Sequence, residues 1–111
     1  MQINETKVGD FTQIELVGDL DAASSPALEE RLTALIAGGT HHLVLECSRL
    51  DYISSAGLRV LLVVAKRVQQ AKGKVVLFAL VPNVREVFSI SGFDKIFQIQ
   101  SDMAGAVAAV R

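Results

Sequence analysis

Strand-like and helix-like stretches alternate along almost the whole chain, and this alternation limits the possible folds more than any other feature. Gly9-Asp10 separates two stretches in which polar and apolar residues alternate, which is typical of a hairpin. A later run from Lys74 is continuously apolar, as expected of a strand buried on both faces. Strands are therefore expected at residues 2–8, 11–17, 42–47, 74–80 and 96–99.

Helical patterns fill the intervals. Ser25-Pro26 combines a favoured capping residue with proline at the first helical position, and Gly38-Gly39 ends the apolar periodicity that follows. Residues 48–53 are expected to form a connection that leads into a second helix, which starts near Ser54 and ends before Gly73. Two shorter helices are expected from Pro82 to Gly92 and from Ser101-Asp102 to the C-terminus.

The resulting order is ββαβαβαβα. Strands that alternate with helices form a mainly parallel sheet with right-handed crossovers, and here an antiparallel hairpin precedes it. The chain has 111 residues, of which 50% are hydrophobic, so residues 1–111 suit one α/β domain with a single sheet and about four helices.

Composition excludes several classes of function. Eleven basic and twelve acidic residues give a net charge of −1 without a long run of either sign, so no nucleic-acid partner is expected. No apolar stretch approaches the roughly 20 residues that cross a bilayer, so no membrane insertion is expected. A single cysteine and a start that does not resemble a secretion signal favour the cytoplasm.

The usual signatures of catalysis are also missing. The chain has no phosphate-binding glycine loop and no nucleophile elbow. His41 and His42 are adjacent at the start of an expected strand, so they are expected to point to opposite faces and not to hold a metal jointly. Cys47 lies in an apolar run, where a small buried side chain is the simplest interpretation, and Asp19 and Asp21 lack an evident acid–base partner. No enzyme activity, metal or cofactor is expected.

The serine pair at the start of the second helix is the main functional candidate. Asp51-Tyr52-Ile53-Ser54-Ser55-Ala56-Gly57-Leu58 joins a buried strand to a helix, so one serine can cap free amide groups. Loops that follow parallel strands meet at one sheet edge, which predicts that the loop of Asp21 lies beside Ser55. The helix N-terminus would also accommodate a phosphate on Ser55.

At these residues the sequence resembles the STAS domain family, and specifically the single-domain anti-sigma factor antagonists of bacterial partner-switching systems. The matching stretches follow the family order and span nearly the whole chain: Gly18-Asp19-Leu20-Asp21, Val44-Leu45-Glu46, Tyr52-Ile53-Ser54-Ser55-Ala56-Gly57-Leu58, Pro82-Asn83-Val84-Arg85-Glu86-Val87-Phe88 and Ser91-Gly92-Phe93. The family's phosphorylated serine corresponds to Ser55. Ser54 stands where aspartate is common, and Ala56 stands where serine or threonine is frequent.

This resemblance implies a switch protein. The unphosphorylated form would bind an anti-sigma factor that is also a serine kinase of the histidine-kinase-like ATPase type, and would thereby release the kinase's target. Phosphorylation of Ser55 would end the binding, and a PP2C-like phosphatase would restore it. Nucleotide would belong to the kinase.

The second helix has two apolar sides. Leu58, Leu61, Leu62, Ala65 and Val68 form the expected core side. Val60 and Val63 fall on the far side. Packing against a neighbouring helix would explain them, and so would a patch flanked by Arg59 and Lys66 that docks a partner; the two explanations are compatible. The expected partner-binding residues are Asp21, Ser54, Ser55, Ala56, Gly57, Arg59, Val60 and Val63.

Two other functions remain open from the sequence. A STAS domain also suits a structural subunit of a lipid-transport or stressosome-like assembly, in which the serine does not switch. The same loop edge also suits a small-ligand or nucleotide-binding module. The target of the pathway, the cognate kinase and phosphatase, and the oligomeric state are not determined by the sequence.

Overall fold

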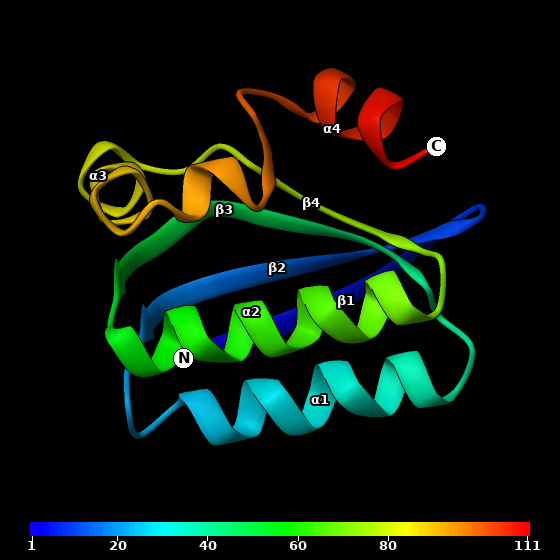
Figure 1. Ribbon diagram of the computed structural model, residues 1–111, viewed down its shortest axis with the longest axis horizontal. Helices are drawn as coiled ribbons and strands as arrows, with labels where there is room; N and C mark the ends of the chain where they lie inside the picture. The colour runs from blue at the N-terminus through cyan, green and yellow to red at the C-terminus, as the bar shows by residue number, and fades with distance from the viewer.

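A five-stranded sheet with helices on both faces forms the protein in the computed structural model, which describes residues 1–111 (Figure 1). The strands lie in the order β1-β2-β3-β4-β5, with β1 antiparallel to β2 and all other neighbours parallel. The expected order ββαβαβαβα is confirmed, with one additional 3₁₀ turn, η1. The elements are β1 (Gln2–Val8), β2 (Phe11–Leu20), α1 (Ser25–Ala37), β3 (His42–Ile53), α2 (Ser55–Gln70), β4 (Lys74–Phe78), α3 (Pro82–Ser91), η1 (Phe93–Lys95), β5 (Gln98–Gln100) and α4 (Met103–Val110).

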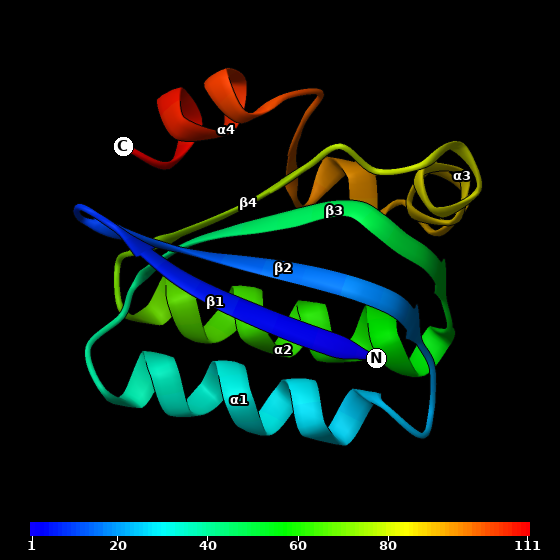
Figure 2. The same cartoon turned by 180° about the vertical axis from the view of Figure 1, so that it is seen from behind.

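The core is divided between the two faces of the sheet. Figures 1 and 2 show α1 and α2 side by side on one face and α4 on the other. Leu43 and Leu45 of β3 belong to the larger apolar cluster, with Leu32 of α1 and Leu61 of α2. Val44 lies between those two leucines in sequence but belongs to the smaller cluster that α4 covers. Successive strand residues point to opposite faces, so a continuously apolar run is buried on both sides.

The central strands are longer than the sequence pattern indicated. The expectation that residues 48–53 form a connection is wrong, because β3 continues to Ile53 beside β2, with Leu20 opposite Ile53. In this extension only Leu50 and Ile53 are buried. Two register shifts also interrupt the β2–β3 pairing. Irregular pairing removes the two-residue period on which strand recognition depends.

Smaller differences occur at other boundaries. Ser24 rather than Ser25 is the N-cap of α1. The strand β4 ends at Phe78, because Ala79 has a left-handed backbone with φ of 62°. The last strand begins at Gln98 instead of residue 96, since η1 occupies the preceding segment.

The start of α2 lies against the end of β2. The Ser54 amide donates to the Leu20 carbonyl oxygen over 2.9 Å. Gly57 is buried in the first turn of α2, and a Cβ atom there would lie 2.7 Å from Leu20 Cγ and 2.9 Å from the Leu20 carbonyl oxygen. Such distances are shorter than normal contacts, so this approach requires glycine.

We predict that Gly57→Ala destabilises the protein even though alanine normally favours a helix by about 1 kcal/mol over glycine. Overpacking costs roughly 1–3 kcal/mol, so a net loss on the order of 1 kcal/mol is expected in urea unfolding. Gly38→Ala is the control, because its Cβ would meet ordinary contacts of 3.4 Å and longer. Equal stability of the two variants would contradict the proposed close packing at Gly57.

Candidate functional site

The loops that follow β2 and β3 meet at one edge of the sheet. The Ser54–Leu20 hydrogen bond and the contact of Gly57 with Leu20 bring the β2–α1 loop next to the start of α2. The expected proximity of the Asp21 loop and the serine pair is therefore confirmed. It follows from the parallel pairing of β2 with β3, which ends both strands at the same edge.

The two serines have different roles in the local structure. Ser54 is the N-cap of α2: its backbone is extended, and its hydroxyl oxygen accepts from the Gly57 amide over 3.2 Å. Ser55 is the first helical residue and is exposed, and its hydroxyl makes no hydrogen bond within the protein. The structural task of capping thus falls on Ser54 and leaves the Ser55 hydroxyl chemically available.

The electrostatic surroundings of Ser55 favour negative charge. The N-terminus of a helix carries partial positive charge from its free amide groups. The first turn of α2 contains no acidic residue that would offset this charge. Arg59 is exposed one turn further along the same helix. An anionic group on Ser55 would therefore lie close to both the helix terminus and a cation.

Asp21 shapes the neighbouring loop. Its Oδ1 atom accepts from the amides of Ala23 and Ser24, over 3.1 and 3.0 Å, and from the Ser24 hydroxyl over 3.1 Å. The hydrogen bonds from Ser24, followed by that from Ala23, hold the pKa of the Asp21 carboxyl below its ordinary value. The Ser24 hydroxyl has a single proton, which it shares between Asp21 Oδ1 and the Asp19 carbonyl oxygen, 2.8 Å from Ser24 Oγ. Asp21 therefore stays ionised at neutral pH and fixes the entry to α1.

The outward face of α2 differs from the sequence expectation. Val60 does not belong to an exposed patch: it is 1% exposed and lies in the main core cluster. Val60 shares this cluster with Leu28 and Leu32 of α1, the helix that lies beside α2. The alternative interpretation, that Val60 packs against a neighbouring helix, is thus confirmed. Conversely, Leu62 and Ala65, which were expected in the core, are only half-buried.

Of the two valines, Val63 remains partly exposed on the outward side of α2, where Leu62 is half-buried as well. Val63 is itself half-buried, and the cationic side chains at Arg59 and Lys66 are exposed. Residues three and four positions apart are neighbours on a helix, so these cations flank Val63. Ala56, also half-buried, lies nearer the start of α2.

The sequence did not assign a role to the start of α3, which borders this edge. The Asn83 side-chain amide donates to the Asp51 carbonyl oxygen over 2.8 Å, so α3 is attached to the end of β3. The next residue, Tyr52, is 49% exposed. The sequence shows an asparagine directly after the proline that starts this helix, which could have marked Asn83 as a candidate. Its hydrogen-bond acceptor lies 32 residues earlier in the chain and is brought close only by the tertiary structure.

Other candidate groups lie away from this edge. Cys47 is buried, and burial raises the pKa of its thiol, so it remains protonated. No group of three or more His, Cys, Asp or Glu side chains is arranged to hold a metal ion. None of the helices has the length and apolar character to cross a membrane.

Comparison with known sequences identifies one family. A model of the STAS domain matches residues 2–106. The chain is 43% identical over 111 residues to BtrV of Bordetella bronchiseptica, which is named as an anti-sigma factor antagonist; the match covers 100% of this chain and 96% of BtrV.

Solved structures give the same fold. A Thermotoga maritima protein named as an anti-sigma factor antagonist matches with a TM-score of 0.94 at 20% identity, over 98% of this chain and 94% of the other. The Bacillus cell fate determinant SpoIIAA in its phosphorylated form matches with a TM-score of 0.76 at 22% identity, over 99% of this chain and 100% of the other. SpoIIAA has also been solved in its unphosphorylated form, which matches with a TM-score of 0.84 at 23% identity, over 99% and 96% of the two chains.

The different roles of the two serines lead to a stability prediction. Ser54→Ala removes the cap of α2 and is expected to cost about 1 kcal/mol of unfolding free energy. Ser55→Ala removes an unbonded, exposed hydroxyl and should stay within about 0.5 kcal/mol of the parent. Urea unfolding of both variants measures the difference. A larger loss for Ser55→Ala than for Ser54→Ala would reverse the assigned roles.

Proposed function

Because this chain belongs to the STAS domain family, we propose that it is an anti-sigma factor antagonist whose partner binding is ended by phosphorylation of Ser55. The observation that carries the proposal is the free, exposed hydroxyl of Ser55 beside a neighbouring serine that does the capping. The name of BtrV supports the antagonist role, and the phosphorylated form of SpoIIAA supports a phosphorylation switch. The domain acts here as a regulator, and no catalytic step is assigned to it.

The proposed modification transfers the terminal phosphoryl group of ATP to Ser55 Oγ, with release of ADP and of the hydroxyl proton. The kinase is an anti-sigma factor with serine kinase activity of the histidine-kinase-like ATPase type, and it supplies the nucleotide site. A PP2C-like phosphatase hydrolyses the phosphoserine and restores the hydroxyl. Because the proposed kinase uses ATP, we expect the protein to act in the cytoplasm.

We expect the fold to accommodate this change without rearrangement. Phosphoserine carries about −1.5 to −2 charges at neutral pH, which the N-terminus of a helix favours. The Ser55 hydroxyl is bonded to no other protein group, so its modification breaks no internal hydrogen bond. Arg59 follows at the i+4 position, where it can pair with the phosphate.

The proposed docking surface is centred on Ser55, Arg59 and Val63. Ala56 adds a small apolar contact, and Asp21 contributes from the adjacent loop. Ser54 and Gly57 support the surface from beneath, because one caps α2 and the other allows its close approach to Leu20. Val60 is excluded from the surface by its burial. A phosphate on Ser55 would add negative charge to this surface and also occupy Arg59.

We predict that phosphorylation of Ser55 and the Ser55→Asp change both weaken partner binding. Placing a charge against a partner surface that is shaped for a neutral hydroxyl costs several kcal/mol of binding free energy. Even a loss of roughly 3 kcal/mol would weaken the affinity about 150-fold. Ser55→Ala should bind like the parent but resist release by ATP. Titration calorimetry with the cognate kinase measures the affinities, and mass spectrometry after tryptic digestion locates the phosphate.

Ser54→Ala is the matched control for the modification, since it retains Ser55. Its labelling should persist, whereas Ser55→Ala should remain unlabelled. Backbone amide spectra should stay dispersed after phosphorylation. Equal affinities of the parent, Ser55→Asp and the phosphorylated protein would contradict the switch, as would phosphate located mainly on Ser54.

A separate prediction concerns Val63. Val63→Glu puts a carboxylate at the centre of the proposed surface and should weaken kinase binding by at least tenfold, about 1.4 kcal/mol. Ile90→Glu makes the same charge change at a side chain that is 79% exposed on α3, and it should bind like the parent. Calorimetry of both variants, with melting temperatures to establish folding, provides the test. Equal losses in the two folded variants would show a general charge effect instead.

A further inference from the structure

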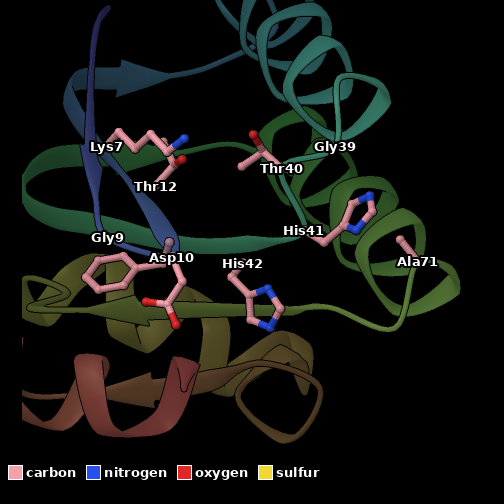
Figure 3. A pocket seen from close by; sticks show the side chains of 10 residues that line it. Lys7, Gly9, Asp10, Thr12, Gly39, Thr40, His41, His42 and Ala71 are labelled. Atoms are coloured by element: carbon pink, nitrogen blue, oxygen red, sulfur yellow. The ribbon is translucent and has the colours of Figure 1, made fainter.

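A polar hollow lies at the edge of the sheet opposite Ser55. It has a volume of about 250 Å³ and is formed by the β1–β2 turn, the α1–β3 connection and the residue after α2, Ala71 (Figure 3). The polar side chains that line it are Lys7, Asp10, Thr12, Thr40, His41 and His42. The helix α2 separates the two sites, and its 16 residues span about 24 Å at 1.5 Å per residue.

Thr12 is the feature of the hollow that the fold does not explain. It is 5% exposed, and its hydroxyl makes no hydrogen bond to another protein group. Every side-chain polar atom that is fully shielded from solvent has a hydrogen-bond partner. The Thr12 hydroxyl has none, so it must be partly accessible to solvent, and the hollow that Thr12 lines provides that access. A nearly buried hydroxyl without a protein partner is uncommon and is suited to a ligand.

Lys7 supplies a cation next to this hydroxyl. Lys7 and Thr12 are opposite each other in the β1–β2 pairing, so their side chains lie on the same face of the sheet. Figure 3 shows both of them at the hollow, with Thr40 across from them. The ammonium group of Lys7 makes no ion pair within the protein. Its charge is therefore not neutralised by a carboxylate.

The side chains that line the hollow are unevenly distributed (Figure 3). His41 directly precedes β3 and His42 is its first residue; Figure 3 shows His41 turned towards Ala71, away from Lys7 and Thr12, and His42 nearer Asp10. Lys7, Thr12 and Thr40 lie together in one half of the hollow. The only lining carboxylate, that of Asp10, is in the other half. The half with Lys7, Thr12 and Thr40 therefore contains an ammonium and two hydroxyls without an acidic group.

We propose that this half of the hollow binds the phosphate group of a small metabolite. An oxyanion with several acceptor oxygens matches a cation accompanied by two hydroxyl donors. The volume of the hollow exceeds that of a single phosphate, so the remainder of the ligand extends towards Asp10 and His42. The Asp10 carboxylate there can accept a hydrogen bond from a donor group on the ligand. This site is independent of Ser55 and of the proposed partner switch.

Inorganic phosphate is the probe for the first test. Backbone amide spectra are recorded at pH 7 during a phosphate titration, with ionic strength held constant by chloride. Saturable shifts are expected at Lys7, Thr12 and Thr40. Thr12→Val keeps the shape of the side chain, and Lys7→Met keeps its length; each should weaken binding at least about fivefold, as loss of a hydrogen bond to a charged group predicts.

Matched variants separate the local site from a general charge effect. Lys95→Met removes a cation outside the hollow and should bind phosphate like the parent. Thr12→Ser retains the hydroxyl and should also bind like the parent, which distinguishes hydroxyl recognition from packing. Asp10→Asn should tighten binding, because it removes the one carboxylate that repels the anion.

Several results would overturn the proposal. These are shifts that do not saturate, shifts centred on Ser55, or unchanged affinity in both Thr12→Val and Lys7→Met. Acetate serves as a second probe, and binding as tight as that of phosphate would reject the phosphate class. Each variant is compared by its melting temperature; if Thr12→Val unfolds, Thr40→Val in the same half replaces it, and an unchanged affinity there would also reject the site.

Discussion

The approach of the α2 backbone to the end of β2 is the constraint on which the functional edge depends. Gly57 lies over Leu20 without room for a Cβ atom, and the Ser54 amide bonds to the Leu20 carbonyl oxygen. Together these contacts fix the direction in which α2 leaves the sheet. They also bring the Asp21 loop, which belongs to a different crossover, next to the serine pair. A larger residue at position 57 would move the helix start, and with it the orientation of the Ser55 hydroxyl.

Capping explains how adjacent serines can have unrelated roles. The cap residue has an extended backbone that turns its oxygen back to the free amides, whereas the first helical residue directs its side chain away from them. Ser54 meets the first condition and Ser55 the second. The hydroxyl that is free for chemistry is therefore separated from the hydroxyl that supports the helix. This separation allows a modification at Ser55 to change the surface while the helix start is retained.

Much of this architecture could be predicted from local patterns, and the exceptions have a common cause. The element order, the hairpin at Gly9-Asp10 and the adjacency of Asp21 to the serines all followed from periodicity and from the rules of parallel sheets. The extension of β3 to Ile53 did not, because register shifts break its alternation. Val60 could not be assigned either, since its burial depends on α1 lying beside α2. Both errors concern contacts between elements, which a single helix or strand pattern does not encode.

The burial of Val60 also changes how the exposed face of α2 can work. With Val60 in the core, Leu62 and Val63 are the apolar residues left between Arg59 and Lys66, and both are half-buried. Such a face offers little apolar area, so recognition there must depend strongly on hydrogen bonds and charge, which give specificity more than affinity. A surface of this kind responds sharply to one added phosphate, because the new charge competes for the same cations that would attract a partner. A larger apolar patch would hold a partner more tightly, but it would be less sensitive to the charge of Ser55.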